Sequence, residues 1–76
     1  MDVMKYIEIN QEIVMGTPVI RGTRISVEII LGKLLNGETV EDIIIAYPLV
    51  SMEAISAVLL FVQSALKMII NLVDVT

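Results

Sequence analysis

The chain has 76 residues and a formal net charge of −4, and 57% of its residues are apolar. A chain of this length forms one small domain, whose interior is too small to cover so much apolar surface, so we expect self-association. The absence of Cys and His excludes disulfides, thiol chemistry, zinc sites built on Cys or His, and acid–base catalysis by His. We therefore predict a protein that is not an enzyme and binds no cofactor or metal.

The charges are unevenly distributed along the chain. In residues 1–37 four basic residues balance four acidic ones, whereas the remainder has only Lys67 against five acidic residues. An acidic second half argues against a broad nucleic-acid-binding surface, which is normally basic. The N-terminus lacks the basic start and apolar core of a signal peptide, so we expect a cytoplasmic location.

Residues 1–25 are predicted to form a β-ribbon region. Weak alternation in residues 5–10 indicates one short strand, which must pair with the ribbon at residues 19–25 or with another subunit. Gly22-Thr23 lies between two short arms and suits a type II′ turn with Gly at its first central position. In that turn Arg21 and Arg24 are directly paired on one face of the ribbon, and Ile20 and Ile25 point to the core.

The paired arginines make this turn the candidate site. Two like charges held opposite each other are unfavourable, so a carboxylate or a phosphate is expected between or above them. The residues predicted to bind a partner or nucleic acid are Arg21, Gly22, Thr23 and Arg24. A structural role is an equal alternative, in which the guanidinium groups tie the ribbon to backbone carbonyls or to Glu8, Glu12 or Glu28.

Residues 26–76 are predicted to form a three-helix unit. Ser26 is the expected N-cap of the first helix, which ends at Asn36-Gly37, and Gly32 within it marks close packing against a neighbour. Thr39 caps a short second helix, with Asp42 completing the capping box. Tyr47-Pro48 ends that helix, and Ser51 caps a long third helix.

The third helix has more apolar surface than one core requires. Its polar residues fall within an arc of about 100°, and they are Glu53, Ser56, Gln63, Ser64, Lys67, Asn71 and Asp74. The wide apolar side predicts burial on the first two helices and also on a second copy, as a homodimer or a higher homo-oligomer. The predicted interface residues are Val58, Val62 and Ile69. A transmembrane role is not favoured, because polar residues recur along one face.

The second and third helices have helix-turn-helix spacing. A DNA-reading helix needs polar or basic side chains near its N-terminus, where this chain has Met52, Glu53, Ala54 and Ser56. The spacing therefore supports this fold more than it supports DNA binding. The fold class is mainly α, with a short N-terminal hairpin and a long C-terminal helix.

The segment GTPVIRGTRISVEIILGKLLNGETVEDIIIAYP resembles the signature of the domain-of-unknown-function family numbered four-thirty-three. That signature is G-x-P-V-I-x-G-T-R-I-x-V, then a Gly-Glu-Ser/Thr turn and a Tyr-Pro, and the match extends from Gly16 to Pro48 and more loosely to Leu60. The resemblance implies a helix-turn-helix-like trihelical unit and an antitoxin-like role of the VapB type. One departure is Ala54, where the family often has a carboxylate.

The resemblance gives the leading functional interpretation. It is an antitoxin-like protein that binds and neutralises a partner PIN-like ribonuclease toxin, an acidic metal-dependent nuclease. The alternative is a helix-turn-helix transcriptional regulator, for example one that regulates its own operon. A scaffold that only oligomerises is a third interpretation that the sequence leaves open.

Overall fold

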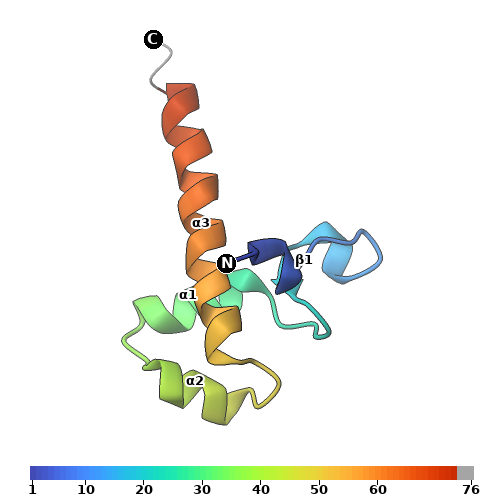
Figure 1. Cartoon of the computed structure of the whole chain (residues 1–76), viewed down its shortest axis with the longest axis vertical. Helices are drawn as coiled ribbons and strands as arrows, with labels where there is room; N and C mark the ends of the chain where they lie inside the picture. The colour runs from blue at the N-terminus through green and yellow to red at the C-terminus, as the bar shows by residue number, and fades with distance from the viewer. Residues whose placement is uncertain (74–76) are drawn as a thin grey trace.

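A computed structural model describes residues 1–73 of the chain (Figure 1). The order of elements is η1 (Val3–Lys5), β1 (Ile7–Glu8), η2 (Val14–Gly16), β2 (Val19–Ile20), α1 (Val27–Leu35), α2 (Val40–Ala46) and α3 (Met52–Val73). The predicted class, a short antiparallel ribbon followed by three helices of which the last is long, is confirmed.

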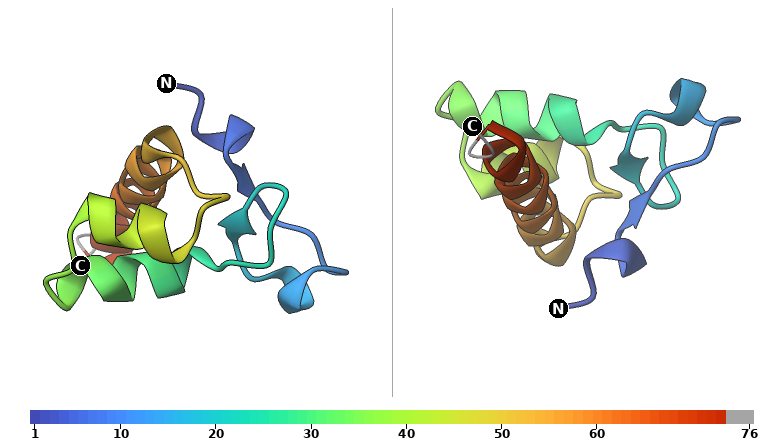
Figure 2. Two further views of the ribbon diagram at one scale, coloured as in Figure 1. Left: turned by 90° about the horizontal axis from the view of Figure 1, so that it is seen from below. Right: turned by 90° about the horizontal axis from the view of Figure 1, so that it is seen from above.

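The ribbon is a small antiparallel sheet. Ile7 pairs with Ile20 and Glu8 with Val19, so the strand expected within residues 5–10 pairs inside its own chain. An isolated bridge between Val19 and Ser26 extends the ribbon up to the start of α1. Figure 2 shows the ribbon beside the helices, with η2 on the side away from α2. The Val19–Ser26 bridge therefore joins strand β2 directly to the N-cap of α1.

Helix α1 has the start and the end that its sequence predicts. The Ser26 hydroxyl accepts a hydrogen bond from the backbone N–H of Ile29 at 3.1 Å, as an N-cap does. At the other end, Gly37 adopts φ +88°, and the N–H groups of Gly37 and Glu38 donate to the carbonyls of Leu34 and Lys33. This pattern is a Schellman motif, in which the left-handed residue is most often Gly.

The caps of the other two helices are also confirmed. Thr39 and Asp42 form a capping box, because each side chain accepts from the other residue's backbone N–H. The Ser51 hydroxyl accepts from the N–H of Ala54 at 3.1 Å and so begins α3. Four residues separate the end of α2 from this cap, which matches the predicted helix-turn-helix spacing.

One apolar core lies where the ribbon and the three helices meet. Each of these elements contributes fully buried aliphatic side chains, and those from the helices include Ile30, Ile43, Ile55 and Val58. From α3 the buried residues come only from its first two turns, between Ala54 and Val58. The core therefore covers the first part of α3 and not its whole length.

The second half of α3 projects away from the domain (Figure 1). Every residue from Gln63 to Val73 is exposed, whereas Phe61 and Val62 just before them are half-buried. The predicted burial of α3 on the first two helices is therefore confined to its first half. Asp74, the last residue of the predicted polar stripe, lies outside the described residues.

Candidate functional site

Residues 21–24, named here the arginine loop, form a tight turn that differs from the predicted one. The N–H of Thr23 donates to the carbonyl of Ile20 at 3.0 Å, so Arg21 and Gly22 are the central residues of the turn. Gly22 has φ +81°, and Arg21 is not among the residues with positive φ. Positive φ at the second central position is the signature of a type II turn. The predicted type II′ turn is therefore wrong, although the need for Gly at position 22 is confirmed.

The change of turn also separates the two arginines. The residues joined across the loop are Ile20 and Ile25, whose N–H···O bond is 2.9 Å long. The loop between them thus has four residues rather than two, and Arg21 and Arg24 are not a cross-strand pair. Ile20 is buried and Ile25 packs against the core, so these two isoleucines lie as predicted.

Arg21 fastens the arginine loop to the N-terminal segment. Its Nη2 atom donates to the carbonyl oxygens of Met4 at 2.9 Å and Ile7 at 3.1 Å, and its backbone N–H donates to Tyr6. Its Nη1 atom lies 3.7 Å from a carboxylate oxygen of Glu8. Of the predicted partners Glu8, Glu12 and Glu28, only Glu8 is engaged. The structural alternative therefore describes Arg21.

We expect Arg21→Gln to destabilise the protein by about 1–2 kcal/mol, because the side chain makes two charge-assisted hydrogen bonds but is half exposed. The exposed Lys5→Gln, which removes a positive charge from the same end of the molecule, should change the stability little. Urea denaturation of both variants provides the measurement. Equal midpoints for Arg21→Gln and the unsubstituted protein would show that these bonds contribute nothing.

Thr23 fixes the middle of the loop with its side chain. Its hydroxyl donates to the carbonyl of Ile20 at 2.7 Å and accepts from the N–H of Ile25 at 3.0 Å. Both polar functions of the hydroxyl are thus used inside the loop. Thr23 is therefore a structural residue of the predicted site, and the same holds for Gly22 because of its positive φ.

Arg24 is the member of the predicted site that faces outward. Its side chain is exposed, and within residues 1–73 its guanidinium has no hydrogen-bond or ion-pair partner. It borders a shallow hollow of about 360 Å³, together with Glu8, Ile13, Gly22 and Thr23. A hydrogen-bonded loop thus presents one arginine with all five of its N–H donors available.

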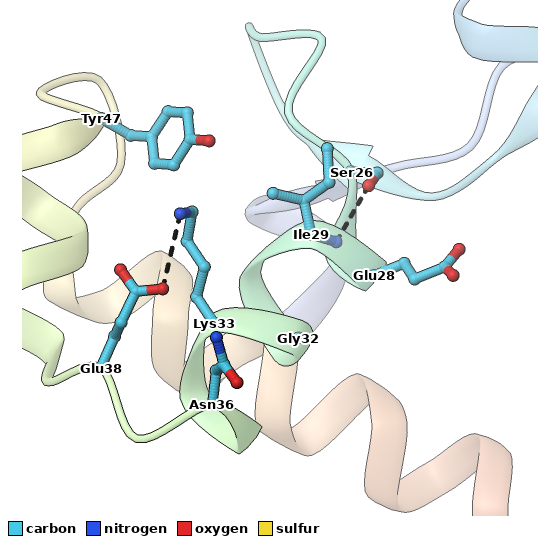
Figure 3. A pocket seen from close by; sticks show the side chains of 8 residues that line it. All are labelled: Ser26, Glu28, Ile29, Gly32, Lys33, Asn36, Glu38 and Tyr47. Carbon is cyan, nitrogen blue, oxygen red and sulfur yellow. Dashed lines mark hydrogen bonds and ion pairs between the residues drawn. The ribbon is translucent and has the colours of Figure 1, made fainter.

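A second hollow lies between α1 and the α2–α3 turn (Figure 3). It measures about 640 Å³ and is open, and no heavy atom lies within 4 Å of a Cβ added at Gly32. Gly32 thus does not mark close packing within the chain. The Lys33 ammonium lies 3.5 Å from Glu38 and 5.5 Å from the centroid of the Tyr47 ring. The cation in this hollow is therefore already paired inside the protein.

The predicted interface residues of α3 differ in position. Val58 is completely buried in the core and cannot contact a second copy, so its prediction is wrong. Val62 is half-buried at the boundary of the core, and Ile69 is 57% exposed on the projecting half. Within residues 1–73, α3 is also the one helix long and apolar enough to cross a membrane.

The helix-turn-helix face is acidic and apolar. Its exposed residues include Glu41 and Asp42 on α2, Glu53 on α3, and Leu49 in the turn between them. No basic residue occurs between Lys33 and Lys67. Helix α2, the turn and the first half of α3 therefore supply no cation of their own to bind DNA phosphates. In the described part of the chain, no cluster of three or more acidic side chains has the geometry of a metal site.

One comparison with known proteins gives a match. The model of the family described as "Protein of unknown function (DUF433)" matches residues 7–62, which include the arginine loop and the core half of α3. This match confirms the resemblance found in the sequence. No curated protein and no solved structure is significantly similar to the chain.

Proposed function

Because the chain belongs to the DUF433 family, we propose that it is an antitoxin-like protein that binds and restrains a partner PIN-like ribonuclease. In this proposal the protein is cytoplasmic and not an enzyme. Arg24 reaches the carboxylates of the partner's metal-binding site, and the rest of the arginine loop holds it in place. Arginine suits this role because its guanidinium group can form two parallel hydrogen bonds to one carboxylate.

The single observation that supports this role is the hydrogen-bonded loop that carries the exposed Arg24. Gly22 occupies the position of the turn that needs positive φ, and the Thr23 hydroxyl bonds within the loop. The Arg21 guanidinium bonds the carbonyl of Met4 in the N-terminal segment. A side chain on such a loop loses little backbone freedom on binding, and this pre-organisation favours affinity.

A helix-turn-helix regulator is the second candidate, and the arrangement of α2 and α3 is the observation that favours it. Its weakness is electrostatic, because Glu41, Asp42 and Glu53 lie where phosphate contacts are needed. DNA binding through Arg24 instead would involve few phosphates. Its affinity would then fall only slowly with increasing salt concentration.

The test uses Arg24→Gln and a purified PIN-like nuclease, taken from a neighbouring gene where one encodes it. We expect the substitution to weaken binding by a factor of ten or more and to relieve inhibition of the nuclease, since it removes one charged pair from the interface. Calorimetry and an RNA-cleavage assay are the measurements. Lys67→Gln is the matched control, because it removes one exposed positive charge far from the loop.

Two results would contradict the proposal. One is that Arg24→Gln, with an unchanged melting temperature, binds and inhibits the nuclease as the unsubstituted protein does. The other is that the protein ignores the nuclease but binds its own promoter DNA with an affinity that falls steeply with salt. The second result would favour the regulator and place its binding surface elsewhere.

A further inference from the structure

The core-facing stripe of α3 continues beyond the domain that it packs on. Within the core it consists of Ile55, Val58 and Val62, and these residues are spaced by three and four positions. The same three–four spacing continues to Ala65, Ile69 and Leu72, which form a heptad repeat with the first three. The part beyond the core, named here the distal seam, comprises Ala65, Leu66, Met68, Ile69 and Leu72.

The distal seam is exposed, although it has the composition of a core. Its four large side chains, Leu66, Met68, Ile69 and Leu72, are between 53% and 75% exposed. Soluble monomers rarely expose a contiguous apolar patch of more than a few hundred Å². At roughly 100 Å² per buried aliphatic side chain, two copies of this seam would bury on the order of 800 Å² together. This area is below the lower end of specific stable interfaces, about 1,200 Å², so the seam alone predicts a weak dimer.

We infer that the distal seam binds the distal seam of a second copy, in antiparallel orientation. Ile55 and Val58 of the stripe are buried in the core, so the domain lies on the seam side of α3, and two parallel helices in register would bring both domains into the same space. In an antiparallel pair the domains lie at opposite ends, and only the projecting halves overlap. This inference does not depend on the proposed function.

The residues of the seam fit this orientation. When Ile69 of one helix faces Ala65 of the other, a large side chain lies opposite a small one, as dense packing requires. The same register places Leu72 opposite Val62 of the partner, next to the partner's core. No charged residue lies in the seam, so the two copies bring no like charges together there.

The opposite face of α3 argues for a protein partner rather than a membrane. Gln63, Ser64, Lys67 and Asn71 lie on that face and are exposed, so one side of the projecting half remains in water. A helix that lies on a membrane surface usually has a polar face rich in Lys and Arg. Here Lys67 is the only basic residue on the helix.

Sedimentation equilibrium at tens of micromolar tests the inference with two matched variants. Ile69→Asp with Leu72→Asp places two charges in the seam, whereas Ser64→Asp with Asn71→Asp places two charges on the polar face. We expect a dimer of twice 8.4 kDa for the unsubstituted chain and for the polar-face variant. The seam variant should be a monomer with an unchanged core, because neither substituted residue contacts the core.

Disulfide formation between introduced cysteines tests the orientation of the two helices. The chain has no cysteine of its own, so every disulfide joins the introduced positions. Chains with Val62→Cys, mixed with chains with Leu72→Cys, should form a mixed disulfide faster than either chain forms one alone. Rapid crosslinking of Leu72→Cys alone would show a parallel pair and overturn the inferred orientation. A monomeric unsubstituted protein, a dimeric seam variant, or flotation of the unsubstituted protein with phosphatidylcholine vesicles would overturn the seam as a dimer interface.

Discussion

Ile43→Ala is expected to destabilise the protein by about 2–5 kcal/mol, the usual cost of truncating a buried isoleucine to alanine. Ile43 is the fully buried residue of α2 and packs in the core against the other helices. The substitution removes three carbon atoms from that position and leaves a cavity. Since small domains are stable by only a few kcal/mol, a large fraction of the variant should be unfolded at room temperature.

Ile45→Ala is the matched control for this prediction. The two isoleucines are two residues apart on the same seven-residue helix, but Ile45 is 78% exposed. Both substitutions replace an isoleucine by the best helix former, so their effects on helix propensity are similar. Urea denaturation followed by circular dichroism should separate them by most of the cost of the cavity. Equal losses of stability would mean that Ile45 is buried in solution, for example by a partner.

The sequence indicated where the helices begin and end because capping depends on local chemistry. Ser26, Thr39 with Asp42, and Ser51 each satisfy backbone N–H groups of their own helix. These hydrogen bonds join residues three positions apart, so they can be predicted without the tertiary structure. The same holds for Gly37, whose left-handed conformation ends α1.

The sequence alone did not indicate how much of α3 the domain covers. Periodicity gives the apolar face of a helix but not the length of its neighbours. Helix α3 has 22 residues and is about 33 Å long, whereas α1 has nine and spans about 14 Å, at 1.5 Å per residue. The short helices therefore bury only the first half of α3. For this reason Val58 is a core residue, whereas Ile69 on the same face is exposed.

The candidate site was predicted in part. The position of Gly22 between two short arms identified the turn and its neighbouring arginines. The type of turn, however, depends on which backbone groups form hydrogen bonds. The carbonyl of Tyr6, just before β1, accepts from the backbone N–H of Arg21, and this contact between distant parts of the sequence is not visible in the local pattern. Val14 shows the same limit of local reasoning, since a β-branched residue rarely adopts its φ of +49°.

Gly22→Val is expected to destabilise the protein by about 1–3 kcal/mol, the usual cost of a residue held in a strained backbone conformation. Gly22 has φ +81°, and no heavy atom lies within 4 Å of a Cβ added there. The loss must therefore come from backbone strain and not from a steric clash with neighbouring side chains. Thermal and urea denaturation of the purified variants provide the measurement.

A graded series at position 22 separates strain from other causes. Asn tolerates positive φ better than other residues with a side chain, Ala less well, and β-branched Val least. We therefore expect the stability to fall in the order Gly, Asn, Ala and Val. The control is Thr23→Val, which leaves the backbone conformation allowed but removes the hydroxyl that bonds Ile20 and Ile25. Thr23→Ser keeps the hydroxyl and should therefore keep most of the stability that Thr23→Val loses. If Gly22→Asn and Gly22→Val are equally unstable, the positive φ is not the reason that glycine occupies this turn.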